Sequence, residues 1–208
     1  MYIPAHFLKT DLAELHDFIE RNSFAMLVSQ QGDGPLASHL PLLLERNAGP
    51  HGSLIGHMAR ANPQWKEADG RTVLAAFSGP HAYISPSWYE AERVVPTWNY
   101  AAVHVYGTFE AVHDAPALLG IVRSYVEFYE RGAPRPWTFA ERDDFIEKLT
   151  QNIVGFRIPI ERIEGKWKLS QNHPADRRQK VIAALEGQGD ENSRAIAALM
   201  RMVQGNRE

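Results

Sequence analysis

The sequence contains no cysteine among its 208 residues. This absence excludes disulfide bonds, thiol nucleophiles, iron–sulfur clusters and zinc sites that need cysteine ligands. The chain also lacks any apolar run close to the roughly 20 residues that a membrane-spanning helix requires. Its first residues do not have the basic and apolar regions of a signal peptide. We therefore expect a cytoplasmic protein without a membrane segment.

A strong excess of either charge is missing too. The chain has 22 Lys and Arg residues against 25 Asp and Glu residues, a formal net charge of −3, which does not suit a protein coated for nucleic-acid binding. Phosphate-binding glycine motifs, a serine-hydrolase elbow and the H-E-x-x-H metal motif are absent, and the nine histidines are dispersed. The sequence therefore predicts neither a doubly wound nucleotide fold nor a metal site.

What is present is the pattern of one globular α+β protein, with 44% hydrophobic residues. Short apolar segments separated by turn residues predict an antiparallel barrel with peripheral helices and a C-terminal helical pair. We expect strands at 24–29, 36–44, 54–58, 73–77, 82–85, 98–112, 155–163 and 166–169, with a hairpin turn at 164–165. We expect helices beginning near Asp11, Pro116, Thr138, Pro174 and Glu191, with Thr138 and Glu141 capping the third. Gly107 indicates a bulge or a close backbone approach.

Residues 83–100 are unusually rich in aromatic side chains. They contain Tyr83, Trp88, Tyr89, Trp98 and Tyr100, interleaved with Ser, Thr, Asn and Pro. One interpretation is a packed aromatic corner of the core. The other is a binding surface for a flat ligand, because aromatic rings stack on flat surfaces and the small polar residues supply directional hydrogen bonds.

Two further segments combine polar residues with strand ends. His57, Arg60 and Asn62 offer an imidazole, a guanidinium and an amide that could bind a phosphate. The alternative is an exposed arginine beside a hydrogen-bonded histidine. Within the segment 38–41, His39 is either a ligand or a half-buried, satisfied residue.

The segment Lys168-Leu169-Ser170-Gln171-Asn172 also has two interpretations. Lys168, Ser170 and Gln171 could reach the rim of a ligand pocket. Alternatively, Ser170 and Gln171 satisfy backbone groups in a turn, and Asn172 or His173 caps the following helix.

These segments occur in an order that carries a family resemblance. The blocks are Tyr2-x-Pro4-x-His6-Phe7, His39-Leu40-Pro41, Gly56-His57-x-Ala59-Arg60-x-Asn62-Pro63-Gln64-Trp65, Tyr83-Ile84-Ser85-Pro86-x-Trp88-Tyr89, Val95-Pro96-Thr97-Trp98-Asn99-Tyr100 and Lys168-Leu169-Ser170-Gln171-Asn172. From residue 1 to about residue 185, the chain resembles the PaiB-like family of FMN-binding negative transcriptional regulators. That family is similar to the FMN-binding split-barrel superfamily, which includes pyridoxamine-phosphate oxidases and flavin reductases.

The resemblance implies a split-barrel flavin-binding domain over residues 1–172 and a helical extension over residues 173–208, packed on the barrel or on a partner subunit. It implies a homodimer that binds FMN at its interface. The expected cofactor residues are Ser38, His39, Leu40 and Pro41 along the isoalloxazine, with Trp98, Asn99 and Tyr100 contributed by the other subunit as a wall above it. His57, Arg60 and Asn62 are expected at the phosphate, and Lys168, Ser170 and Gln171 at the rim. No catalytic residue and no metal ligand is predicted.

Three functions stay open at this point. The protein is a flavin-binding regulator or sensor, an FMN-dependent oxidoreductase, or a haem-binding or haem-degrading split-barrel protein with His6, His39 or His57 as the axial ligand. Direct DNA contact has weak support, because residues 173–208 carry six basic against five acidic residues. The apolar stripe of the last helix, Ile196, Leu199, Met200 and Val203, is better explained by packing than by DNA recognition.

Overall fold

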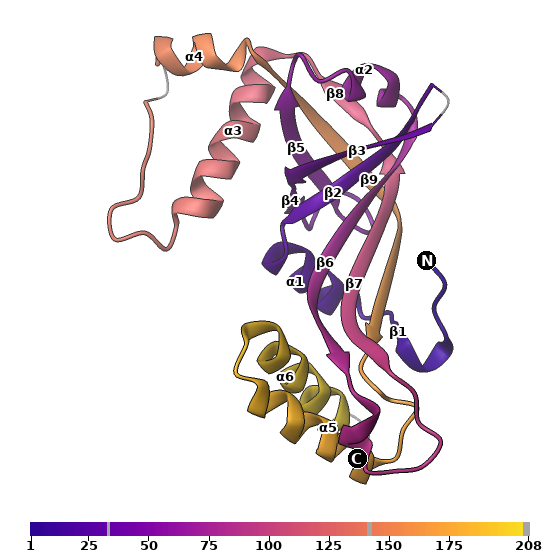
Figure 1. Cartoon of the computed structure of the whole chain (residues 1–208). Coiled ribbons are helices and arrows are strands. Elements are labelled where there is room, and N and C mark those ends of the chain that lie inside the picture. Colours follow the sequence, from indigo (N-terminus) through magenta and orange to yellow (C-terminus); the bar gives the residue numbers. More distant parts are fainter. Residues whose placement is uncertain (33, 141–142, 206–208) are drawn as a thin grey trace. The chain divides into compact units, whose positions relative to one another are not determined.

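The computed structural model describes residues 1–32, 34–140 and 143–205. Within these ranges the chain forms a nine-stranded antiparallel sheet and six α-helices, which confirms the expected α+β class (Figure 1). The strands are β1 (Leu8–Lys9), β2 (Phe24–Gln31), β3 (Gly34–Pro41), β4 (Leu43–Glu45), β5 (Ser53–Ala59), β6 (Thr72–Ile84), β7 (Thr97–Thr108), β8 (Glu110–Val112) and β9 (Ile153–Lys168). Their order is β3-β2-β6-β7-β9-β5-β4, and β1 and β8 each pair with β9.

The helices connect and flank these strands. They are α1 (Leu12–Arg21), α2 (Gln64–Ala68), α3 (Ala115–Glu130), α4 (Asp144–Thr150), α5 (Ala175–Gln188) and α6 (Glu191–Gly205), with short 3₁₀ turns η1 (Ala5–Phe7) and η2 (Pro86–Tyr89). The side chain of Asp11 accepts a hydrogen bond from the Glu14 N–H, which confirms the predicted start of α1. None of the helices in the described ranges has the length and apolar composition to cross a membrane.

The chain divides into two compact units. The first unit comprises residues 1–18, 78–104 and the chain from 164 onward, and the second comprises residues 19–77 and 105–163. Because the boundaries fall within β6, β7 and β9, each of these strands contributes residues to both units.

In the first unit, α5 and α6 pack against each other and are joined through Gly189, which has a φ of +79° (Figure 1). Val181, Ile182 and Leu185 of α5 are fully buried, as is Ile196 of α6. Met200 of α6 accepts a weak hydrogen bond from the Asn99 side chain of β7. The apolar stripe of α6 is therefore used in packing within this unit, as predicted.

The core of the second unit is built on the inward faces of its strands. The fully buried residues there include Leu27, Leu54 and Phe77, and the rings of Phe109 and Phe156 stack with their centroids 4.6 Å apart. In the β2–β3 hairpin, Leu27 lies opposite Ser38 and Met26 lies opposite His39. Since strand side chains alternate, this register places Met26 and His39 on the face opposite to the buried Leu27.

Four strand predictions were wrong. The strand expected over 98–112 is divided into β7, which ends at Thr108, and β8, which begins at Glu110. The segments 73–77 and 82–85 form one continuous strand, β6, and the predicted hairpin at 164–165 is instead part of β9. Gly165 serves close packing, because a Cβ there would lie 2.3 Å from Leu15 Cδ2 and 3.0 Å from Lys9 O. The strand expected over 36–44 ends at Pro41, and β4 begins at Leu43.

One helix start was wrong as well. Asp143, not Thr138, caps α4, because its carboxylate accepts hydrogen bonds from the N–H groups of Phe145 and Ile146. The second expected capping residue, Glu141, lies outside the described residues.

The prediction of a close approach at Gly107 is confirmed. A Cβ at this position would lie 2.1 Å from the backbone oxygen of Pro159 in β9. Only glycine permits this spacing, because a backbone atom cannot rotate away as a side chain can.

We expect Gly107→Ala to lower the free energy of unfolding by about 1–3 kcal/mol, the usual cost of forcing extra atoms into a packed region. Gly120→Ala on the exposed side of α3 is the matched control, because nothing lies within 4 Å of the added methyl group. The control should leave stability unchanged or raise it slightly, since alanine favours a helix. Chemical denaturation of both variants measures the difference, and equal stabilities would refute the close approach.

Candidate functional site

The predicted cofactor segment 38–41 forms the end of β3, which pairs with β2 at one end of the sheet order. Here His39 is exposed and its ring stacks on Phe24, with centroids 6.2 Å apart. Phe24 is itself 67% exposed, and Met26 beside it is also exposed. We call the surface formed by Phe24, Met26, Val28, Ala37, His39 and Pro41 the β2–β3 face. An exposed face with this much apolar area is typical of a ligand or partner surface.

His57 on β5 packs against Tyr125 of α3, with ring centroids 4.8 Å apart. Its Nδ1 is buried and has no hydrogen-bond partner among the described residues, and burial lowers the pKa of its imidazole. The ring is therefore neutral at pH 7. A neutral imidazole contributes no charge to binding a phosphate.

The hydroxyl of Tyr125 on α3 fixes the same region. It donates to the backbone oxygen of Pro41 at 2.5 Å and lies 3.2 Å from that of Ile55. Burial, followed by the neighbouring Tyr129, raises the pKa of Tyr125, so that the hydroxyl stays protonated as a donor. The contact joins α3 to the end of β3 that carries the predicted flavin residues.

Arg60 follows β5 and is anchored to the chain that leads into β9. Its Nε and Nη2 donate to the backbone oxygens of Gln151 and Ile153, each at 2.7 Å. These two bonds fix the plane of the guanidinium, and the Nη1 amino group carries the donors that remain for a ligand.

Asn62 links two of the predicted segments. Its Nδ2 donates to Ser38 Oγ at 3.0 Å, and its Oδ1 accepts from the Gln64 N–H at 3.0 Å. The structure thus brings Ser38 and Asn62 together, but through a direct bond that occupies the Asn62 amide.

Gln64 is a structural residue that sequence reasoning missed. It is completely buried, and its Nε2 lies within hydrogen-bond distance of Leu27 O, Ser29 Oγ and Leu36 O. These bonds fasten α2 to both strands of the β2–β3 hairpin. The sequence feature that could have identified Gln64 is its position in the block Asn62-Pro63-Gln64-Trp65. An amide donor that becomes buried needs hydrogen-bond partners.

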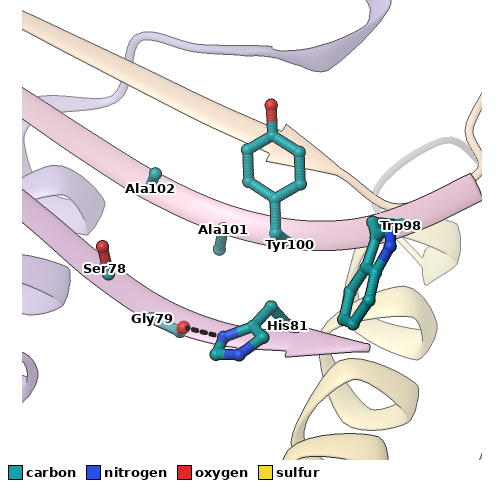
Figure 2. A pocket seen from close by; sticks show the side chains of 7 residues that line it. All are labelled: Ser78, Gly79, His81, Trp98, Tyr100, Ala101 and Ala102. Atoms are coloured by element: carbon teal, nitrogen blue, oxygen red, sulfur yellow. Dashed lines mark hydrogen bonds between the residues drawn. The ribbon is translucent and has the colours of Figure 1, made fainter. Parts of the chain in front are cut away.

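In the first unit, β6 and β7 border an open cavity of about 340 Å³, which we call the β6–β7 pocket (Figure 2). It is lined by Ser78, Gly79, His81, Trp98, Tyr100, Ala101 and Ala102. Trp98 is 52% exposed, and its ring lies 6.1 Å from that of His81 and 6.0 Å from that of Tyr83. The small residues leave room beside the aromatic rings, so that a flat ligand can reach them.

The aromatic segment divides into a packed part and an exposed part. Tyr89 is buried and its ring packs on His173, as a core corner would require. Tyr83 and Trp98 are exposed, as a binding surface requires. The sequence did not indicate that Ser78, Gly79 and His81 of β6 line a cavity, because a short strand segment does not show which distant strand will pair with it.

Asn99 belongs to a different cavity from Trp98 and Tyr100, because successive side chains of β7 point to opposite faces. The amide of Asn99 is completely buried and donates to Ser170 Oγ at 3.1 Å. Lys168 donates through Nζ to Thr97 Oγ1 and to the backbone oxygen of Trp98. Asn99, Lys168 and Ser170 are thus brought together, away from the β6–β7 pocket.

Gln171 takes the structural role that was its alternative interpretation. Its Oε1 accepts from the Leu169 N–H at 2.7 Å, and its Nε2 donates to Trp167 O at 2.6 Å. The same alternative was wrong about the helix cap. Pro174 is the N-cap of α5, and no side chain caps that helix.

Comparison with known proteins identifies the family of the chain. A family profile described as "Putative FMN-binding domain" matches residues 1–162. The chain is 38% identical over 202 residues to the Bacillus subtilis protein named protease synthase and sporulation protein PAI 2, covering 96% of each chain.

Two solved structures share the fold. One is the flavocytochrome Anf3 from Azotobacter vinelandii, with a TM-score of 0.61, 11% identity and coverage of 80% of this chain and 72% of the other. The other is the FAD and haem binding protein from Mycobacterium smegmatis, with a TM-score of 0.61, 15% identity and coverage of 85% and 79%. The predicted antiparallel split-barrel fold is confirmed. With the profile match and the Bacillus relative, these findings show that the chain belongs to the PaiB-like family of FMN-binding proteins.

Proposed function

We propose that this protein is an FMN-binding regulator or sensor that holds its flavin at the interface of a homodimer. The observation that carries the flavin assignment is the β6–β7 pocket, which presents Trp98 and Tyr100 beside small residues in a family of FMN-binding proteins. The regulatory part is supported by the Bacillus relative, whose name refers to protease synthesis and sporulation.

FMN matches the chemistry of these residues both through its flat ring and through its phosphate. Its isoalloxazine is a flat ring that can stack on exposed aromatic side chains such as Trp98. Bound FMN supplies one- or two-electron redox chemistry, and the protein contributes binding and orientation. Within the second unit, Ser38 to Pro41 form a strand segment along which the ring can lie, with the aromatic wall contributed by the other protomer, and the Nη1 group of Arg60 is a donor for the phosphate.

The homodimer follows from exposed apolar surface. Phe24 and Met26 on the β2–β3 face, and Tyr83 and Trp98 in the first unit, are all exposed in the single chain. Such surfaces are usually covered by a partner, and a two-fold dimer is the commonest arrangement. We assign residues 173–208 as a helical extension of the split-barrel domain formed by residues 1–172, supported by the contact between Met200 and Asn99.

Regulation by direct DNA contact is not part of this proposal. The apolar residues Ile196 and Met200 of α6 are buried and are not available to a DNA groove. Cytoplasmic location remains a prediction from the sequence.

The flavin assignment predicts a yellow protein that releases FMN on heating. Trp98→Ala should raise the Kd for FMN by about 2- to 13-fold, from the 0.5–1.5 kcal/mol typical of an aromatic contact. Trp137→Ala is the matched control, because both indoles are 52% exposed. Fluorescence titration of flavin-depleted protein measures both values, and equal Kd values for the two variants would contradict the placement of the ring.

The same preparation separates the three functions. Steady oxidation of NADH or NADPH by the FMN-loaded protein would identify an oxidoreductase rather than a sensor. A Soret band on titration with haemin, without any flavin binding, would favour the haem alternative with His6, His39 or His57 as ligand.

The phosphate assignment predicts a difference between FMN and riboflavin. Arg60→Ala should raise the Kd for FMN by roughly 10- to 150-fold, the range for losing one charge-assisted hydrogen bond. Riboflavin lacks the phosphate, and its Kd should change little. Arg71→Ala, which removes another exposed arginine of the second unit, is the control. An equal loss for both ligands would show that Arg60 acts only through the backbone it anchors.

The dimer predicts a light-scattering mass of about twice the 23.5 kDa chain. Phe24→Asp should shift the protein toward the monomer at micromolar concentration, because it places a charge in an apolar interface. Phe145→Asp on α4 is the matched control, since Phe24 and Phe145 are both 67% exposed. A monomeric mass for the unmodified protein, or equal masses for both variants, would argue against an interface at the β2–β3 face.

A further inference from the structure

The first unit contains a second cavity, of about 280 Å³, which we call the basic pocket. It brings together three segments that are far apart in the sequence. The first segment contributes His6, near the N-terminus. The second contributes Arg93, before β7, and Thr97, the first residue of β7. The third contributes Lys168, the last residue of β9, followed by Asn172 and His173. All of them belong to the same compact unit.

The basic pocket carries positive charge. Arg93, which is exposed, and Lys168 line it, and none of the described residues that line it is Asp or Glu. Lys168 donates to Thr97 Oγ1 and to the backbone oxygen of Trp98, which are neutral groups. Burial and then the neighbouring Lys166 lower the pKa of Lys168, and burial, Arg177 and Lys168 lower the pKa of His173. A bound anion would favour the charged forms of both groups.

Neutral hydrogen-bonding groups in the pocket are held in place by a buried framework. Ser170 is buried and adopts a φ of +62°, and its hydroxyl lies 3.1 Å from Asn99 Nδ2 and 3.2 Å from Tyr89 OH. Arg93 also has a positive φ, of +59°. Two of the strained non-glycine residues thus line one cavity, and such strain is concentrated at ligand sites.

The basic pocket is separate from the β6–β7 pocket. Thr97 and Asn99 line the basic pocket, whereas Trp98 and Tyr100 line the other, and neighbouring side chains of β7 point to opposite faces. A flavin ring stacked on Trp98 of one chain therefore does not fill the basic pocket of that chain.

We propose that the basic pocket binds the phosphate group of a small phosphorylated molecule other than the flavin. Two cationic side chains suit a dianion, and the Asn172 amide and the two imidazoles add further hydrogen-bond donors. Phe7, Val94 and Val95 line the rest of the cavity and provide an apolar wall for the organic part of that molecule. The proposal does not depend on flavin binding.

Phosphorus NMR titration of the full chain tests this proposal, with inorganic phosphate, phenyl phosphate and phenol as probes. Phenyl phosphate should bind more tightly than inorganic phosphate, and proton-detected titration with phenol should show no binding. Arg93→Gln should raise the Kd for phenyl phosphate by about 10-fold or more, as the loss of a charge-assisted bond implies. Lys168→Met should have a similar effect, and thermal melting of each variant checks the fold.

The matched control is Arg194→Gln, which removes an exposed arginine of α6 in the same unit and should leave the Kd unchanged. Equal effects of Arg93→Gln and Arg194→Gln would overturn the proposal, because they would indicate general attraction to positive charge. Phenol binding as tightly as phenyl phosphate would also overturn it.

A competition experiment distinguishes this ligand from the flavin phosphate. Saturating FMN should leave the Kd for phenyl phosphate unchanged, and Arg60→Ala should leave it unchanged as well. If FMN displaces phenyl phosphate while riboflavin does not, the pocket holds the flavin phosphate and the separate ligand is refuted. If the protein binds phenyl phosphate but no flavin, the proposed FMN function fails while the basic pocket stands.

Discussion

The alternation of side chains along β7 is the constraint on which the first unit depends. Trp98 and Tyr100 line one cavity, while Thr97 and Asn99 line another, because adjacent residues of a strand face opposite ways. A single strand thereby separates an aromatic surface from a polar, basic one. A shift of one residue in its pairing would exchange the two sets of side chains and place Trp98 where the buried Asn99 amide now lies.

Buried amides are what make that register costly to change. Asn99 has its partners in Ser170 and Met200, and Gln64 in the second unit has its partners in Leu27, Ser29 and Leu36. A buried amide without a partner costs about 1–3 kcal/mol, which is a large share of the net stability of a small domain. Polar groups in both units therefore specify which strands and helices meet, while the hydrophobic residues supply most of the burial energy.

Local patterns predicted the elements of this fold but not their contacts. The Asp11 cap and the stripe of α6 were readable, because each depends on a few neighbouring residues. Gly107 indicated a close approach, but the sequence did not show that its partner is Pro159. The hairpin at 164–165 was a wrong prediction, since a glycine needed for close packing looks the same in a sequence as a turn glycine. Of the residues that line the two cavities, Trp98, Asn99, Tyr100 and Lys168 were singled out from the sequence as cofactor residues, which remains a prediction, and the structure divides them between the cavities. Ser78, His81 and Arg93 were not singled out, because their position beside a cavity depends on which strands and loops lie next to them.

Arg60 and Arg93 make different contacts. Arg60 donates to two backbone oxygens and so anchors the end of β5 to the start of β9. Arg93 lines a cavity without a carboxylate, on a backbone with positive φ. A non-glycine residue at positive φ costs free energy, and such strain is concentrated at functional sites. An external anion would interact favourably with the exposed guanidinium of Arg93 and with the ammonium of Lys168, which donates to Thr97 Oγ1 and to the backbone oxygen of Trp98. The positive charge of the basic pocket is therefore better explained by a ligand than by the stability of the fold.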